Sequence, residues 1–391
     1  MATSMSVRTP EPTLADARPS QKIPPPRNRI LDFVRIGLAL LVLLSHAPEL
    51  VDGNRSRELL TRYGRTDISF GEVGVDFFFV LSGYLITRSW VLDPRLGDYL
   101  KKRLLRILPG YVIAFVGSIV VCGLVAPSLP RVAWFEGLFH RPLVMHAAIS
   151  FFILSVPWTP DAFPGQAFHA VNSSLWTLGF EFRCYLLVAL FGVLRLFRIR
   201  TAWLIATLAS GLAFPWRGGI DAHAWHHYTW ITGSVGEDIR LFFAFLLGGS
   251  FFLYKKYIAF RPTMVAAAAL LLLVSLLTHT QFQLVLLVTG AYLMFALEKV
   301  QLPNTGWYAK VPDISYGMYV YGWPVQQLCI WFLHPNPWLL FMLSSVISMF
   351  MGALSWHFVE RPMLALKPRP SAPLPPDSLE SSTTTRGLLR S

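Results

Sequence analysis

Residues 30–50 read ILDFVRIGLALLVLLSHAPEL, and this stretch decides the class of fold. A helix needs ~20 apolar residues to cross a hydrocarbon core that is ~30 Å thick, and the stretch supplies them with few polar interruptions. The interruptions include Arg35 and His46, which a bilayer tolerates only at a cost. The stretch therefore predicts a transmembrane helix over residues 30–49. Its ionisable groups are expected to have a function or a partner within the protein.

Further apolar runs of the same kind follow along the chain. Hydrophobic residues make up 54% of the 391 residues and charged residues only 14%, whereas a soluble domain carries about a quarter charged residues. We therefore expect an all-α fold, a polytopic membrane helix bundle with about ten transmembrane helices, at residues 30–49, 71–91, 108–127, 174–194, 201–215, 239–255, 263–279, 281–297, 313–333 and 338–358. The run at 201–215 is the shortest, and 143–157 is an eleventh possibility.

The placement of Lys and Arg predicts how the bundle is oriented. The net charge of +12 would suggest nucleic-acid binding in a soluble protein, but here the cations gather in loops beside apolar runs, as the positive-inside rule expects. Ten spans with both termini in the cytoplasm put most of these loops inside, at 92–107, 195–200, 255–261 and 298–312. If 143–157 crossed, 195–200 would fall outside, so we expect 143–157 to lie in or dip into the outer face. The outer loop 51–69, with four arginines, departs from the rule.

The two ends of the chain differ in composition from its middle. Residues 1–29 are polar and proline-rich, which predicts a disordered cytoplasmic tail and no cleavable signal peptide. Residues 364–391 have a similar disorder-like composition, so any chemistry belongs to a transmembrane domain at 30–363. The three cysteines lie in apolar runs and predict packing residues rather than disulfides. The histidines of HAWHHY at 223–228 lack further ligands with zinc-site spacing, so we expect no metal.

Arg35 and His46 are the first candidate pair. They are eleven positions apart in one predicted helix, which returns them to within ~20° of each other and separates them by about 16 Å along the axis. Both should therefore face the same side, with Arg35 near the cytoplasmic end, His46 near the outer end, and a shared cavity across most of the bilayer. Taken singly, Arg35 could snorkel to headgroups and His46 could be a hydrogen-bonded packing residue.

The second span, from residue 71, reads GEVGVDFFFVLSGYLITRSW and adds two candidates. Asp76 lies about a turn inside its outer end, close to the depth of His46, and a carboxylate there could orient the imidazole; the alternative is an Asp that caps this helix. Ser82 is a candidate substrate-binding residue. A nucleophilic role for Ser82 is conceivable, but the GxSxG elbow is lacking. Gly83 permits close approach of another helix.

A basic amphipathic segment, DYLKKRLLRILPG, precedes the third span, which Pro109 is expected to start. Arg103 and Arg106 are three residues apart and share one helical face at the inner surface. Paired guanidinium groups suit a polyphosphate because each can bind bidentately. The alternative is an anchor to anionic lipid at the inner leaflet.

Glu181 is the candidate in the span that begins SLWTLGFEFRCYLL at residue 174. A buried Glu in a span is a functional candidate by default, and the alternative is an ion pair with another helix. Trp176 in the same span and Tyr319 in the span at 313–333 are candidates for contact with substrate.

Six stretches, in this order, resemble those of the acyltransferase-3 family of bacterial inner-membrane O-acyltransferases, over about residues 28–363. They are Arg-x10-His from Arg35 to His46, GVDFFFVLSGYLIT at 74–87, Arg-x-x-Arg-x-x-Pro from Arg103 to Pro109, SLWTLGFEF at 174–182, ISYGMYVYGWPV at 314–325 and FVERP at 358–362. The resemblance implies about ten spans, an acyl-CoA donor bound from the cytoplasm, and a glycan or similar hydroxyl acceptor that is often periplasmic.

The resemblance also assigns roles by position. It makes His46 the catalytic residue, and it makes donor-binding residues of Arg35, Arg103 and Arg106. Asp76 and Glu181 match positions that are commonly acidic in the family. This chain departs from the family at Gly322, where a histidine is frequent, so no second histidine role is expected.

These features give one hypothesis and two rivals. The phosphates of acyl-CoA, with acetyl as the default acyl group, bind the three arginines, and the arm of the donor runs outward to His46. His46 then deprotonates the sugar hydroxyl, with Asp76 orienting it, or attacks the thioester itself. A transporter or flippase of a glycan precursor or small anion would bury similar charges, but the inner arginine pair and the lack of paired broken helices favour the enzyme. A membrane scaffold would not explain the aligned Arg35 and His46.

Overall fold

The computed structural model describes residues 30–66, 68–217, 234–299 and 312–367, which form helices and no β-strand. The predicted all-α class is confirmed for this part of the chain. The predicted tail at 1–29, most of the tail at 364–391 and the histidines of HAWHHY lie outside the described residues. In chain order the helices are α1 (Ile30–Asp52), α2 (Leu59–Gly64), α3 (Phe70–Leu92), α4 (Leu96–Val125), α5 (Arg131–Gly137), α6 (Arg141–Phe152), α7 (Trp176–Val193), α8 (Arg200–Ala213), α11 (Val235–Leu253), α12 (Pro262–Thr278), α13 (Phe282–Leu297), α14 (Ser315–Leu333), α15 (Pro337–Ser355) and α16 (Arg361–Ala365).

Each of the ten predicted spans coincides with one helix, the shortest being α8 with 14 residues. Among the described residues, five helices are long and apolar enough to cross a membrane: α1, α3, α4, α7 with the turn before it, and α15 with its continuation into α16. Helices α12 and α13 are apolar but shorter. The figure of ten spans therefore stays a prediction. The eleventh candidate, 143–157, overlaps α6, whose 12 residues rise only ~18 Å.

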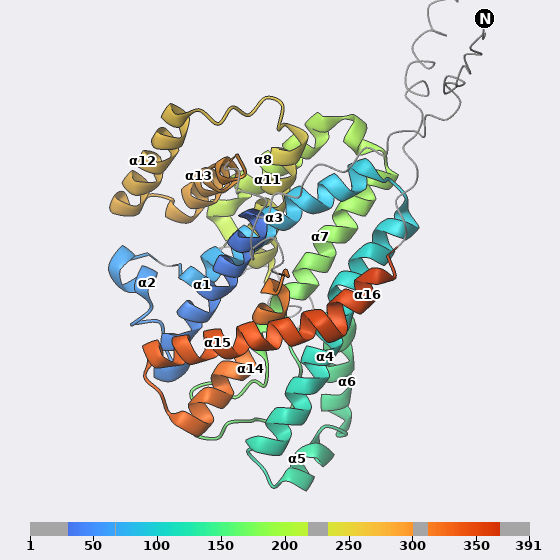
Figure 1. The fold of residues 1–391 in the computed structure, drawn as a ribbon, viewed down its shortest axis with the longest axis vertical. Coiled ribbons are helices and arrows are strands. Elements are labelled where there is room, and N and C mark those ends of the chain that lie inside the picture. Colours follow the sequence, from blue (N-terminus) through green and yellow to red (C-terminus); the bar gives the residue numbers. More distant parts are fainter. Residues whose placement is uncertain (1–29, 67, 218–233, 300–311, 368–391) are drawn as a thin grey trace, which may run out of the picture.

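Successive long helices alternate in direction, which gives the bundle two ends (Figure 1). We call the end that holds residues 30 and 367 the terminal end; the connections at 93–95, 194–199 and 254–261 also lie there. The other, distal end carries α2, α5 and α6. Helix α3 runs through the centre in contact with α1, α7 and α11, while α12 and α13 form a pair at one side.

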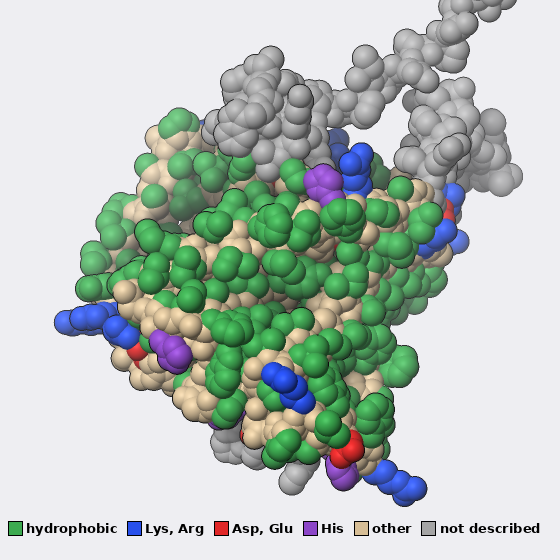
Figure 2. Space-filling view, turned by 60° about the horizontal axis from the view of Figure 1, so that its bottom comes forward, with side chains coloured by type: hydrophobic (Ala, Val, Ile, Leu, Met, Phe, Trp, Pro, Cys, Tyr) green, Lys and Arg blue, Asp and Glu red, His purple; other side chains and the backbone are tan. Residues whose placement is uncertain are grey.

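The surface between the two ends is apolar. Figure 2 shows hydrophobic side chains covering the broad middle of one face, with charged side chains mainly at its margins. The outward sides of three helices expose large apolar residues: Ile205, Leu208 and Leu212 on α8, Leu270, Leu273 and Leu277 on α12, and Met342, Val346 and Phe350 on α15. Such a wide apolar surface would be unfavourable in water and suits the hydrocarbon of a bilayer.

Two glycines allow α3 and α11 to pack closely at the centre. A Cβ atom on Gly83 would lie 1.9 Å from the carbonyl oxygen of Phe245, and a Cβ atom on Gly248 would lie 1.9 Å from the carbonyl oxygen of Val80. The two backbones therefore touch reciprocally, in the way that small residues bring helices together in membranes. The expectation that Gly83 permits close helix approach is confirmed.

Helix α4 begins earlier than the third span was expected to begin. The amphipathic segment and the span form one helix of 30 residues with Pro109 inside it, so the expected start of the third span does not coincide with the start of a helix. Proline removes one backbone donor from a helix interior, but tertiary contacts hold this turn. Tyr316 donates from its hydroxyl to the carbonyl of Ile107 at 2.8 Å, and its ring packs against Gly110, where a Cβ would leave no room.

Candidate active site

A cavity of about 330 Å³ lies at the terminal end, between α1, α3, α4, α7 and α14. Its lining includes six of the nine residues singled out as candidates from the sequence. They are Arg35, Ser82, Arg103, Arg106, Glu181 and Tyr319. Residues that are up to 284 positions apart in the chain are thus brought to one site.

Two of the three cavity arginines already have acidic partners. Arg35 donates to Asp313 at 2.8 Å, and Arg106 donates to the same carboxylate at 3.1 Å. Arg106 also donates to Glu360 at 2.7 Å, which lies in a π-helical turn, Trp356–Glu360, between α15 and α16. Such irregular turns often occur at functional sites. Sequence reasoning missed both acidic partners, because neither is near the arginines in the chain.

Arg103 is the cavity arginine with no carboxylate within ion-pair distance among the described residues. Arg103 donates a hydrogen bond to the hydroxyl of Ser89 at 3.3 Å, and its guanidinium also lies 5.8 Å from the ring of Tyr99 and 5.9 Å from that of Tyr185. The Nε atom of Arg103 is buried without a hydrogen-bond partner in the described structure. An anionic ligand in the cavity would give it one.

Glu181 lies on the cavity wall with two hydroxyl groups directed at it. Tyr185, one turn later in α7, donates to Oε1 of Glu181 at 2.5 Å, and Ser82 on α3 donates to the same atom at 3.2 Å. The alternative of an ion pair between Glu181 and another helix finds no support in the described residues, where Glu181 accepts hydrogen bonds from these two hydroxyls.

Tyr319 and its neighbours close the cavity towards the distal end. The hydroxyls of Tyr319 and Thr177 share a hydrogen bond of 2.8 Å, and the ring of Phe78 meets that of Tyr319 edge-on at 6.0 Å. Trp176 is half-buried, packs against Phe180 at a ring separation of 5.5 Å, and does not line the cavity.

His46 lies beyond this closure. Its ring meets Trp323 edge-on at 5.3 Å, and Trp323 follows Tyr319 by one helical turn on the same face of α14. The His46 side chain is 22% exposed. His46 and Arg35 thus both face the segment that carries α14, as their spacing predicts, but His46 does not line the cavity that holds Arg35. The expected open path from Arg35 to His46 is interrupted by the hydrogen bond between Tyr319 and Thr177, which lies at the edge of the cavity.

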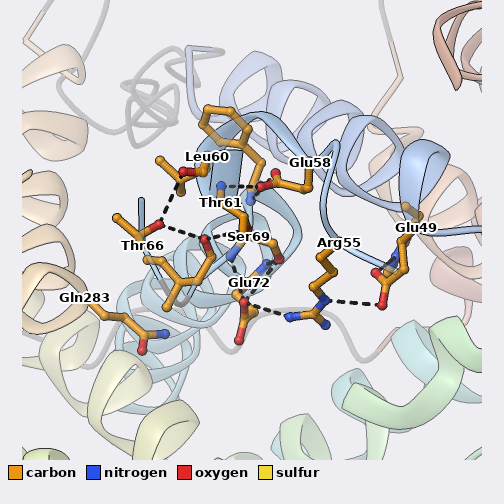
Figure 3. Close-up of polar contacts among 12 residues, drawn as sticks. Glu49, Arg55, Glu58, Leu60, Thr61, Thr66, Ser69, Glu72 and Gln283 are labelled. Carbon is orange, nitrogen blue, oxygen red and sulfur yellow. Dashed lines mark hydrogen bonds and ion pairs between the residues drawn. The ribbon is translucent and has the colours of Figure 1, made fainter. Parts of the chain in front are cut away.

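The acidic neighbour of His46 is Glu49. Nδ1 of His46 lies 3.5 Å from Oε2 of Glu49, three residues later in α1, a distance that allows an ion pair and exceeds a hydrogen bond. Glu49 accepts from Arg55 at 3.2 Å, and Arg55 also donates to Glu72 at 3.3 Å (Figure 3). Burial lowers the pKa of Arg55, but Glu49 and Glu72 raise it more, so the guanidinium stays charged.

The chain of contacts ends in a rigid helix start. Glu72 accepts from the backbone N–H of Ser69 at 2.7 Å, while the backbone N–H of Glu72 donates to the Ser69 hydroxyl at 3.3 Å. This reciprocal capping box fixes the first turn of α3. Figure 3 shows Glu72 between this cap and Arg55, so the position of Glu49 beside His46 is determined by helix α3 as well as by α1.

Asp76 has other partners than the one expected. Its two oxygens lie 3.1 Å from Arg240 of α11 and 3.1 Å from Gln283 of α13, and Asp76 and Arg240 are almost fully buried. The side chain of Asp76 points away from His46 because of its position around the axis of α3. Gly74 faces α1, where a Cβ would meet the carbonyl oxygen of Leu38 at 2.8 Å, and two further residues turn Asp76 by ~200°, away from α1 and His46. Its observed role is to join α3, α11 and α13.

The structure also explains why a glycine stands at position 322. A Cβ there would lie 2.8 Å from a side-chain carbon of Leu43. Leu43 of α1 therefore occupies space beside α14 that a larger residue at 322 would need.

Among the described residues no group of three or more His, Cys, Asp or Glu side chains could hold a metal ion.

The fold and cavity together define a membrane helix bundle with a basic cavity at one end and a half-buried carboxylate, Glu181, on its wall. Residues 28–357 match a family model described as an acyltransferase domain, and the chain belongs to this acyltransferase-3 family. It is therefore an acyltransferase enzyme, which agrees with the expected class and disfavours the transporter.

Curated relatives extend this similarity over most of the chain. An O-acetyl transferase of Shigella phage Sf6 is 26% identical over 357 residues, which cover 86% of this chain and 96% of the relative. Nodulation protein 10 of Rhizobium leguminosarum bv. viciae is 23% identical over 351 residues, or 86% of this chain and 93% of the relative. Acyltransferase MdmB of Streptomyces mycarofaciens is 24% identical over 147 residues, or 37% and 34%. No solved structure shows significant similarity.

Proposed function

We propose that this enzyme transfers an acyl group, acetyl by default, from acyl-CoA to a hydroxyl of a glycan or another sugar-containing acceptor. The observation that carries the proposal is the cavity that gathers Arg35, Arg103 and Arg106 at the terminal end, below His46. Guanidinium groups recognise the phosphates of a coenzyme A donor. The name of the phage relative, O-acetyl transferase, supports an oxygen acceptor and an acetyl group.

We place the terminal end in the cytoplasm of a bacterial cell and the chain in its inner membrane. Acyl-CoA then enters the cavity from the compartment in which it is made, and both ends of the chain lie on that side. Arg103, which has no carboxylate partner among the described residues, is the first contact for a phosphate. Arg35 and Arg106 can contribute only by sharing or exchanging their bonds to Asp313 and Glu360.

The reaction then requires passage beyond Tyr319. The pantetheine arm displaces the hydrogen bond between Tyr319 and Thr177, and the thioester reaches His46. Nδ1 of His46 faces Glu49, which leaves Nε2 to accept the proton of the acceptor hydroxyl. The oxygen attacks the thioester carbonyl, the C–S bond breaks, and the CoA thiolate takes the proton back from the imidazolium. Glu49, in place of the expected Asp76, orients the ring and stabilises its charge.

The test uses the full chain in lipid nanodiscs with acetyl-CoA and a panel of sugar acceptors. Release of the CoA thiol should require an acceptor and should yield an acyl ester on it, detected by mass spectrometry. His46→Ala should lower the rate by the 10²–10⁴-fold that a general base contributes while leaving the melting temperature unchanged. Acylation by His46→Ala at a near-normal rate would refute the mechanism, and a lack of transfer to any hydroxyl by the native protein would refute the proposed reaction.

A further inference from the structure

A second cavity, of about 590 Å³, lies at the terminal end and shares no lining residue with the first. It is bounded by the end of α3 and start of α4, by the connection from α7 to α8, and by the end of α11. Five cations contribute to its lining: Arg195, Arg198, Arg200, Lys255 and Lys256. No Asp or Glu lines it.

These five cations are not neutralised within the described structure. All five are exposed, and no ion pair to a carboxylate within 4 Å joins any of them in the part of the chain that the structure describes. By contrast, Lys102 and Arg95 nearby both bind Asp93. An unpaired cluster of cations attracts an anion, and each Lys or Arg near an anionic lipid surface contributes about 1 kcal/mol to binding.

The rest of the lining is apolar and built by close packing. It includes Trp90, Leu96, Val193, Phe197 and Phe252. Trp90 fits because Gly192 opposite it lacks a side chain; a Cβ there would lie 1.8 Å from the indole. Leu96 and Val193 are exposed, so apolar surface continues from the cavity onto the outside of the bundle, where hydrocarbon is expected.

The connection from α7 to α8 brings the start of a helix to this cavity. Arg195 has a φ angle of 58°, in the left-handed region that favours glycine, and this turn takes the chain from α7 to α8 without a long loop. Helix α8 then begins at Arg200, whose own side chain lines the cavity. The unpaired N–H groups of a helix start favour an anion nearby.

We infer that this second cavity binds the phosphate headgroup of an anionic phospholipid from the leaflet at the terminal end. The cations would contact the phosphate, and the exposed apolar rim would contact the acyl chains. A water-soluble phosphate compound has the same anionic chemistry but nothing to place on the apolar rim. The site is independent of acyl transfer, because its lining residues are separate from the first cavity and from His46.

The test compares two triple variants with equal loss of charge. Arg198→Gln, Arg200→Gln and Lys256→Gln remove cations from the cavity; the control removes three exposed cations of the same end that do not line it, with Arg88→Gln, Lys101→Gln and Arg361→Gln. Binding of short-chain phosphatidylglycerol to the purified full chain in neutral detergent is followed by native mass spectrometry and by thermal shift. Phosphatidylcholine, inorganic phosphate and adenosine 3′,5′-bisphosphate serve as competing ligands.

The cavity variant should bind phosphatidylglycerol about 100-fold more weakly than native protein, since each cation near an anionic headgroup contributes roughly fivefold. The control should bind within about threefold of native, by the same weak dependence on remote charge. Equal binding by the two variants would overturn the site. Competition by adenosine 3′,5′-bisphosphate at concentrations similar to those of the lipid would overturn the lipid and assign a soluble phosphate ligand. Both variants should retain native circular dichroism, because all six side chains are exposed.

Discussion

Arg103 differs from the other two cavity arginines because no carboxylate in the described structure neutralises it. Its contacts are one hydroxyl and two aromatic rings, so its charge is available to a ligand. A hydrogen bond to a charged group contributes about 1.5–3 kcal/mol. We therefore assign it the largest share of donor affinity.

We predict that Arg103→Gln raises the KM for acetyl-CoA by roughly 10- to 100-fold, the equivalent of one charged hydrogen bond, with a much smaller fall in kcat. Initial rates over a range of acetyl-CoA concentrations measure both constants. Arg88→Gln, an exposed arginine at the same end of the bundle, is the matched control and should leave KM unchanged. An unaltered KM in Arg103→Gln would remove this residue from the donor site.

The contact between Glu49 and His46 leads to a different kinetic signature. Glu49→Gln should lower kcat by roughly 10- to 100-fold, a part of what general base catalysis supplies, with little change in the KM for the donor, because Glu49 does not line the cavity that holds the three arginines. Glu49→Asp, which keeps the charge, should restore part of the rate. Loss of activity in both variants together with a lower melting temperature would instead indicate a structural role through Arg55.

At the residue scale, local pairs could be predicted and distant ones could not. The spacing of Arg35 and His46 fixes their common face within one helix, and both do meet the segment that carries α14. Asp76 was expected at the depth of His46, but Gly74, two residues before it, already packs against Leu38 and Val42, and the side chain of Asp76 points away from α1. Its partners, Arg240 and Gln283, come from helices more than 160 positions later. Glu49 could have been found from its spacing of three residues from His46.

At the scale of elements, the reciprocal glycine contact brings the backbones of α3 and α11 directly against each other. Because each missing Cβ faces a backbone carbonyl rather than a flexible side chain, neither helix can accommodate a larger residue without moving. Helix α3 carries Ser82 and, through its capping box, positions Glu72. A displacement of α3 would therefore alter both the cavity and the surroundings of His46.

Gly83→Ala should lower the melting temperature and the activity together, with a loss of roughly 1–3 kcal/mol as for other overpacked sites. Gly37→Ala is the matched control, since a Cβ there meets nothing within 4 Å, and alanine is the better helix former by about 1 kcal/mol. Thermal unfolding in the same detergent compares the two. If Gly83→Ala is as stable as Gly37→Ala, the close contact of α3 with α11 is not as described.

Helix positions were predictable because each depends on a long apolar run, and all ten runs contain a helix. The start of α4 could not be predicted in the same way, since Pro109 is a strong signal for a helix start. The contacts that hold the helix through this proline come from Tyr316, about 200 residues away. The π-helical turn at Trp356–Glu360 likewise has no local signal.

At the scale of the whole molecule, the alternation of helices makes a prediction about sidedness. Tyr63 and Tyr257 are exposed at the distal and terminal ends, and the three native cysteines are buried. A membrane-impermeant maleimide added to intact spheroplasts should label Tyr63→Cys and not Tyr257→Cys, while both should react after lysis. Labelling of both positions in intact spheroplasts would contradict the alternating arrangement.

The closure at Tyr319 has a consequence for the cell. A water-filled passage from Arg35 to His46 would let protons and small ions leak through the bilayer and would dissipate the gradient that an energised membrane maintains. We infer that the hydrogen-bonded hydroxyls of Tyr319 and Thr177, together with the ring of Phe78, form a thin seal across that route. A donor arm threaded through the seal would itself plug the opening, so catalysis need never leave the membrane permeable.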